Sequence, residues 1–268
     1  MINLASFVLI CGLLVSFFSV TAQAAVEKKT IIYSGTDGTK FEGQLISPKS
    51  VKPGAGSVLM IHNWMGVTAE TIHQAERFAD LGYTVFAADI YGQGLRPKDA
   101  TEAGTQATRF KKDRKLFRER LNLALTEMKK NKSVEANKIA VIGYCFGGTG
   151  ALELARSGAA IAAAISFHGG LDSPTPNDGK NIRAHVLALH GAIDPYVSTT
   201  DVNAFEDEMK ISHVDYQLVK YSDTVHSFTE VGAGTDNSKG AAYNALSDKR
   251  SFLATENFLN ELFNSAKK

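Results

Sequence analysis

The sequence has almost no net charge. Its 268 residues include 29 lysines and arginines against 28 aspartates and glutamates, and no long segment carries a single sign. Nucleic-acid binding requires a basic surface that neutralises phosphates, so we expect no nucleic-acid partner. Hydrophobic residues nevertheless make up 44% of the chain. This content excludes a mainly disordered protein, because disordered chains lack the apolar surface needed for a core.

The sequence also lacks metal-site spacings, internal repeats and low-complexity segments. None of the seven histidines recurs in a pattern such as HExxH, which would place two ligands on one helical face. We therefore predict neither a metal nor a cofactor. No shift in composition marks a linker between domains, and an α/β chain of this length usually remains a single domain.

The one long apolar run lies at the N-terminus. Leu4 to Val20 is apolar apart from serine and glycine, and Ala22-Gln23-Ala24 has the small residues of a signal-peptidase site. We predict a signal peptide over residues 1–24, export to the periplasm or the medium, and a domain over residues 25–268 with no membrane association. One feature does not fit a signal peptide, because no lysine or arginine precedes the run. The alternative is an uncleaved anchor, because the run is long enough to span a bilayer and Lys28 and Lys29 lie just beyond it.

Cysteine is scarce. Of the two cysteines, Cys11 lies in the predicted signal peptide, so Cys145 would be the single thiol of the mature domain. An internal disulfide is then impossible. A lone thiol in an oxidising compartment is a liability unless it is buried or used, so the residues around Cys145 decide its role.

Short apolar runs alternate with amphipathic stretches along the rest of the chain, which is typical of a sheet with helices on both faces. The first two runs alternate in polarity and flank Gly35-Thr36-Asp37-Gly38, which predicts an antiparallel hairpin. The later runs are apolar throughout, as buried parallel strands are. We therefore predict an α/β fold with a mostly parallel central sheet. Strands are expected at residues 30–33, 41–47, 56–62, 84–88, 138–143, 162–167, 184–190 and 214–221.

Apolar residues at spacings of three and four predict helices between these strands. One such stripe ends near Gly82, and a second lies in the charged stretch from Asp99 to Lys130. Two more cover residues 202–209 and 258–262. Burial alone requires this spacing, so we interpret the stripes as core packing.

The segment GYCFGG at residues 143–148 lies between a predicted strand and a helix rich in small residues. Its pattern is that of a nucleophile elbow with Cys145 in place of serine. The sharp turn leaves no room for bulky side chains two residues before and after the nucleophile, where Gly143 and Gly147 stand. The N-terminus of the following helix favours a thiolate. The alternative is a glycine-rich turn that contains a buried cysteine.

A thiol nucleophile needs a base and a residue that orients it. Asp194 and His226 follow later strands in the order acid then histidine, and the carboxyl ends of such strands meet at one crevice. His62, at another strand end, is the only competing base. For the developing oxyanion we predict the backbone N–H groups of Phe146 and Trp64 as donors.

The segments GYCFGG, GAIDPYV, VHSF, IHNWMGV and ADIYGQGLRP together resemble the dienelactone hydrolase family, from about residue 30 to the C-terminus. The resemblance implies a single-domain α/β-hydrolase fold with eight strands and a Cys145, Asp194, His226 triad. It also implies hydrolysis of small esters or lactones through an acyl-cysteine. We expect a monomer whose partner is such a small molecule.

The sequence departs from the family at the position of Asn63. Members of the family typically have a glutamate there. The resemblance implies that this carboxylate keeps the catalytic thiol unreactive until the substrate binds. Asn63 cannot take a proton or carry charge, so we expect Cys145 to pair directly with His226 and to be more permanently a thiolate.

Further departures affect the substrate. Two arginines that hold the substrate carboxylate in the family correspond to Gln93 and Glu230, and Arg96 is near but displaced. Glu230 would repel an anion, so dienelactone itself is not expected as the substrate, and a small apolar or neutral acyl group fits best. The residues predicted to line or support the pocket are Asn63, Tyr91, Gln93, Arg96, Tyr196 and Phe228.

Two other classes of function remain open from the sequence. A redox or peroxide-reducing protein would use the same activated thiol, but it normally needs a resolving cysteine, which the mature chain lacks. A catalytically silent binding module could retain the fold.

Overall fold

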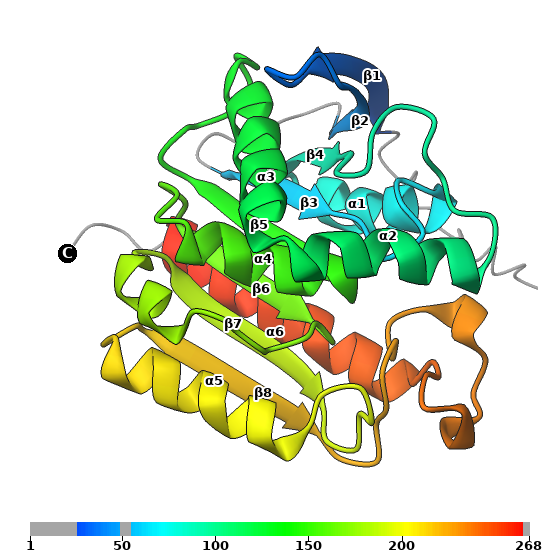
Figure 1. Ribbon diagram of the computed structural model, residues 1–268. Coiled ribbons are helices and arrows are strands. Elements are labelled where there is room, and N and C mark those ends of the chain that lie inside the picture. The colour runs from blue at the N-terminus through cyan, green and yellow to red at the C-terminus, as the bar shows by residue number, and fades with distance from the viewer. Residues whose placement is uncertain (1–25, 49–54, 265–268) are drawn as a thin grey trace, which may run out of the picture.

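A computed structural model describes residues 26–48 and 55–264 (Figure 1). The predicted signal peptide lies outside the described residues, so cleavage and export stay predictions. None of the helices in the described ranges combines the length and apolar character needed to cross a membrane.

One sheet of eight strands forms the centre of the molecule, in the spatial order β1-β2-β4-β3-β5-β6-β7-β8. β1 and β2 pair antiparallel, as do β2 and β4, and the remaining pairs are parallel. All eight predicted strands and the hairpin are confirmed, with ends that shift by a few residues. The strands are β1 (Glu27–Ser34), β2 (Lys40–Ser47), β3 (Ser57–Ile61), β4 (Thr84–Ala88), β5 (Ile139–Tyr144), β6 (Ala163–Phe167), β7 (His185–Gly191) and β8 (Tyr216–Tyr221).

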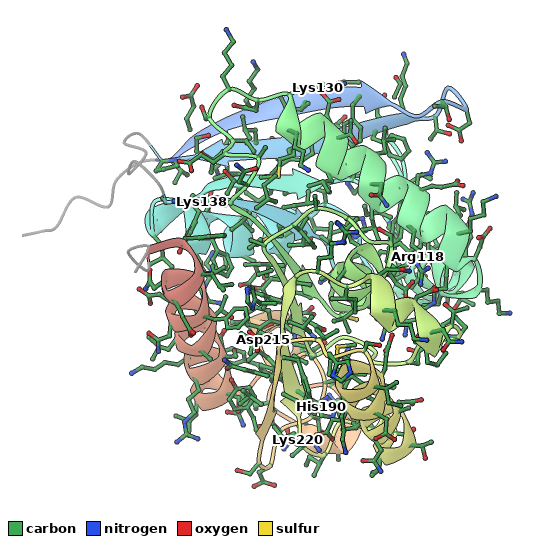
Figure 2. All side chains as sticks on the ribbon, turned by 90° about the vertical axis from the view of Figure 1, so that its left-hand side faces the viewer. Arg118, Lys130, Lys138, His190, Asp215 and Lys220 are labelled. Carbon is green, nitrogen blue, oxygen red and sulfur yellow. The ribbon has the colours of Figure 1, made fainter. Side chains whose placement is uncertain are left out.

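Helices cover both faces of the sheet, as predicted. In Figure 2, α6 lies on one side of the sheet, and α3 and α5 lie on the other. The helices are α1 (Ala69–Asp80), α2 (Ala100–Lys112), α3 (Arg114–Lys129), α4 (Phe146–Arg156), α5 (Thr199–Ile211) and α6 (Ala245–Asn264), with short 3-10 turns η1 (Pro176–Asn181), η2 (Val231–Ala233) and η3 (Asn237–Lys239).

Each face of the sheet has its own hydrophobic core. Side chains alternate along the central strands, so Leu59 belongs to the core on the face covered by α2, α3, α4 and α5, whereas Met60 belongs to the core on the face covered by α1 and α6. This alternation explains why the central strands are apolar throughout. The charged stretch expected to be helical is divided at Asp113, whose backbone leaves the helical region and whose carboxylate caps α3 by accepting from Leu116 N–H at 2.9 Å.

A buried ion network holds α4, the helix that follows the predicted elbow. Arg156 is fully buried and donates two hydrogen bonds to Glu208 of α5, at 2.9 and 2.6 Å, and one to Glu153 at 3.0 Å. Arg118 of α3, labelled in Figure 2, reaches the other oxygen of Glu153 at 2.8 Å. Because both Glu153 oxygens have cationic partners, its burial is compensated and α4 is tied to two neighbouring helices.

Candidate active site

Cys145 lies at the sharp turn between β5 and α4, with φ 54° and ψ −113°. This backbone conformation is strained for a residue with a side chain. A Cβ atom on Gly143 would lie 1.9 Å from the carbonyl oxygen of Gly147, and one on Gly147 would lie 2.2 Å from the carbonyl oxygen of Ile61. The turn therefore has the geometry of a nucleophile elbow, and both predicted glycines are required by backbone contacts.

The structure brings the three predicted catalytic side chains together. His226 Nε2 lies 3.1 Å from Cys145 Sγ, and His226 Nδ1 lies 2.8 Å from Asp194 Oδ2. Asp194 is buried, and its second oxygen accepts from the backbone N–H of Tyr196 at 2.8 Å. Cys145 follows β5, Asp194 follows β7 and His226 follows β8, and only β6 lies between β5 and β7 in the sheet. The carboxyl ends of these parallel strands therefore carry the thiol, the carboxylate and the imidazole to one edge of the sheet.

The electrostatics of this group favour a charged imidazole. Burial lowers the pKa of His226, but the sulfur of Cys145 and the carboxylate of Asp194 outweigh burial and raise the pKa to about 10. Beside the thiolate, the imidazolium is therefore stabilised and loses its proton as the pH rises through about 10. A protonated imidazole beside the sulfur favours a thiolate–imidazolium pair.

The competing base, His62, is occupied elsewhere. Its Nδ1 donates to the carbonyl oxygen of Asn63 at 2.6 Å, and its Nε2 accepts from the backbone N–H of Ile90 at 3.2 Å. Burial lowers its pKa to about 4, so the ring is neutral. His62 therefore supports the loop after β3 and has no free nitrogen for proton transfer.

The two residues predicted to supply oxyanion donors both lie at the pocket of the nucleophile. Trp64 follows β3, Phe146 begins α4, and both line the same pocket as Cys145. Within the described part of the chain, no hydrogen bond occupies the backbone N–H of either residue. These N–H groups are available to an oxygen bound beside the sulfur.

The pocket above Cys145 has a volume of about 330 Å³ and mostly apolar walls. Tyr196 is the one residue of the predicted pocket set that lines it. Tyr91 is buried outside the pocket, and its hydroxyl donates to the Trp64 carbonyl at 3.0 Å. Phe228 is fully buried in the core. The lining residues are Trp64, Gly104, Ala107, Thr108, Lys111, Cys145, Phe146, Gly170, Tyr196, Val197, His226, Ser227 and Ala241.

The loop after β4 carries two predicted pocket residues away from the site. Gln93 is exposed and donates to Glu42 at 3.3 Å, and Arg96 donates to the Val67 carbonyl at 2.8 Å. The interpretation of both as substrate-pocket residues is corrected. Their proximity in sequence to a family motif was misleading because the loop turns its side chains toward β2 and the start of α1.

One wall of the pocket was missed in the sequence. Gly104, Ala107, Thr108 and Lys111 lie on one face of α2, at the three- and four-residue spacing of a helix. The sequence contains one signal for these residues. They form a stripe of small side chains that ends in a lysine and lies beside the buried face of α2. Their position at the pocket of Cys145 depends on where α2 packs in the fold. The spacing of residues in the sequence does not predict that packing.

Asn63 and Glu230 contact each other behind the pocket. Asn63 Nδ2 donates to Glu230 Oε1 at 3.0 Å, and both line a small cavity of about 10 Å³ that lies apart from the substrate pocket. Burial raises the pKa of the Glu230 carboxyl, while the Asn63 amide and the charge of His226 oppose that increase. Glu230 is therefore not a wall of the substrate pocket, which corrects the argument that it repels an anionic substrate there.

Comparison with known proteins gives a consistent result. A sequence model of the dienelactone hydrolase family matches residues 41–263. A putative carboxymethylenebutenolidase of Aquifex aeolicus is 26% identical over 72% of this chain and 83% of its own. The solved structure of m3DLH is 35% identical, with a TM-score of 0.83 over 89% of this chain and 99% of its own.

A second solved structure, a dienelactone hydrolase-like promiscuous phosphotriesterase from metagenomic libraries, is 32% identical with a TM-score of 0.82 over 89% of this chain and 99% of its own. The predicted resemblance and fold class are thereby confirmed. The chain belongs to the dienelactone hydrolase family and is a hydrolase of carboxylic esters or lactones.

Proposed function

We propose that hydrolysis proceeds through an acyl-cysteine intermediate on Cys145. The observation that carries the proposal is the continuous contact from the Cys145 sulfur through His226 to Asp194, at 3.1 and 2.8 Å. This is the arrangement of a nucleophile, a base and an orienting carboxylate.

In the proposed reaction the thiolate of Cys145 attacks the carbonyl carbon, and the carbonyl oxygen becomes an oxyanion held by the N–H groups of Trp64 and Phe146. The intermediate collapses, the carbon–oxygen bond breaks, and His226 Nε2 gives its proton to the departing alkoxide. Neutral His226 then takes a proton from water as the water attacks the thioester. The carbon–sulfur bond breaks, the acid leaves, and the thiolate–imidazolium pair is restored. Asp194 holds the imidazole in position throughout.

The simplest experiment compares the wild-type protein on two substrates. We expect steady hydrolysis of p-nitrophenyl acetate and no consumption of hydrogen peroxide. Peroxide consumption without ester turnover would favour the redox alternative, and the absence of both, across neutral, anionic and lactone esters, would favour a binding module.

The pocket also supports a proposal about substrate charge. Its walls include one lysine, Lys111, whose Nζ lies 3.2 Å from the position that a Cβ on Gly170 would take. Among the described residues, no carboxylate lies within ion-pair distance of this ammonium, and the nearby Asp172 is paired with Arg114 at 2.6 Å. We propose that Lys111 favours an acyl group with an anionic end, in place of the neutral acyl group expected from the sequence.

Lys111→Met tests this proposal, because methionine keeps the apolar stem and removes the charge. We expect kcat/KM for an anionic p-nitrophenyl hemisuccinate to fall about two- to fivefold, as for an exposed ion pair, while kcat/KM for p-nitrophenyl acetate stays constant. The effect should shrink at high salt. Lys112→Met, on the next residue of α2 but not in the pocket, is the matched control. Equal changes for both esters would contradict the role of Lys111.

The direct contact between Cys145 and His226 predicts that the Cys145 thiol reacts with alkylating reagents at a lower pH than a free thiol does. The charges of Cys145 and Asp194 raise the pKa of His226 to about 10. Its other charged or titratable neighbours include Glu230, neutral His168, His190 and Tyr196. We expect iodoacetamide alkylation to reach half of its maximal rate well below the pH of about 8.5 that is typical of a free thiol. A midpoint at or above that pH would contradict the proposal that Cys145 and His226, with Asn63 in place of the family glutamate, form a thiolate–imidazolium pair in the free enzyme.

A further inference from the structure

The side-chain amide of Asn63 joins two loops of the active site. Its Nδ2 donates to Glu230 at 3.0 Å, and its Oδ1 accepts from the backbone N–H of Met65 at 2.9 Å. Asn63 follows β3, whereas Glu230 lies on the loop of His226, after β8. Strands β5, β6 and β7 separate β3 from β8 in the sheet. This amide therefore ties the loop of the proposed oxyanion donor to the loop of the proposed base.

The bond to Met65 closes a turn around Trp64. An asparagine oxygen that accepts from the N–H two residues later forms an Asx turn. The turn continues with a hydrogen bond from Gly66 N–H to the Asn63 carbonyl at 3.3 Å, and the Tyr91 hydroxyl donates to the Trp64 carbonyl at 3.0 Å. The position of the Trp64 peptide, and with it the N–H proposed to bind the oxyanion, therefore depends on the Asn63 side chain.

Glu230 determines which way the Asn63 amide faces. Burial raises the pKa of the Glu230 carboxyl, whereas the Asn63 hydrogen bond and the charge of His226 lower it. Glu230 Oε1 accepts from Asn63 Nδ2 at 3.0 Å, and the Met65 N–H on the other side of the amide can only donate. With the amide reversed, its oxygen would face the carboxylate and its NH₂ group would face another donor. Asn63 is 6% exposed, so water is a poor replacement for the lost partners.

We propose that Glu230 is a positioning residue for ester hydrolysis: it locks the Asn63 amide in the orientation that holds the Trp64 N–H in place for the oxyanion. The inference rests on the proposed acyl-cysteine mechanism. Glu230 acts through Asn63 and the Trp64 turn, without touching the reacting atoms. Because the oxyanion exists only after attack on the carbonyl, loss of this orientation lowers kcat and leaves KM nearly constant.

The inference is tested by exchanging the hydrogen-bond donor at residue 63 with the acceptor at residue 230. Asn63→Asp places a carboxylate opposite Glu230, and we expect kcat for p-nitrophenyl acetate to fall about 100-fold, the loss typical of a small misplacement at a catalytic site. Adding Glu230→Gln supplies an amide donor to the new carboxylate, which can still accept from Met65, and should restore most of kcat. Glu230→Leu alone should lower kcat, whereas Glu230→Gln alone keeps an acceptor and should lower it much less.

Glu70→Gln is the matched control, because Glu70 lines the same small cavity but contacts Gln74 instead of Asn63. We expect its kcat to equal that of the wild type. Thermal melting establishes that each variant is folded.

Alkylation of Cys145 by iodoacetamide, measured at its high-pH plateau, provides a readout that involves no oxyanion. Its rate should be the same in all variants. Unchanged kcat in Glu230→Leu, or a parallel loss of kcat and alkylation that Glu230→Gln does not rescue, would overturn the positioning role. An inactive wild type would instead overturn the hydrolytic mechanism before any variant is compared.

Discussion

Replacing Cys145 with alanine is expected to lower kcat for p-nitrophenyl acetate by about 10⁴-fold or more, as in other enzymes that lose a triad nucleophile. The Ala variant retains the backbone of the elbow and loses only the sulfur that lies 3.1 Å from His226. Without the thiolate, neither the oxyanion nor the thioester can form. The measurement is the steady-state rate under saturating ester.

His226→Ala should have an effect of similar size, because the thiolate loses both its counter-ion and its proton donor. Residues of a catalytic unit are strongly non-additive, so the double variant of Cys145 and His226 should be no slower than either single variant. His73→Ala, exposed on α1, is the histidine control and should retain wild-type kcat. Substantial turnover in Cys145→Ala would show that the sulfur is not the nucleophile.

Gly143→Ala is expected to be the most destabilising single substitution at the site. Its Cβ would lie 1.9 Å from the Gly147 carbonyl oxygen and 2.7 Å from the Gly148 nitrogen, and backbone atoms at the start of α4 cannot rotate away as a side chain can. We expect a loss of more than about 4 kcal/mol, in the range of severe steric conflict, and a fall in Tm of about 10 °C or more for a domain of this size.

Gly104→Ala provides the opposite control within the same protein. Gly104 lies inside α2, and an added Cβ would meet no atom within 4 Å. Alanine there should raise stability by roughly 0.5–1 kcal/mol, because it reduces the freedom of the unfolded chain. A Gly143→Ala protein that melts with the wild type would contradict the close approach between β5 and α4.

Much of the fold could be predicted because each strand carries a local signal. The run at β3 is apolar on both faces since α3 and α4 cover one side and α1 covers the other, and such runs are distinctive in a sequence. The break at Asp113 could not be predicted from apolar spacing. It depends on one residue that leaves the helical conformation while capping the next helix.

The catalytic side chains could be placed from the sequence because each directly follows a strand, and carboxyl ends of parallel strands converge. The surrounding residues depend on tertiary packing. Lys111 reaches the pocket through the position of α2, and Asn63 meets Glu230 across 167 positions of the chain. Their side chains carry no local signal of these contacts, which is why Glu230 was assigned to the wrong side of the site.

The most direct test of the account is the mass of the protein mixed rapidly with p-nitrophenyl acetate and quenched in acid. The proposed mechanism predicts a burst of nitrophenolate and one added acetyl group, located by peptide mapping at Cys145. The adduct should accumulate in His226→Ala if any acylation remains, and it should be absent in Cys145→Ala. Rapid turnover with no acyl group on Cys145, or with the acyl group on another residue, would contradict the central claim.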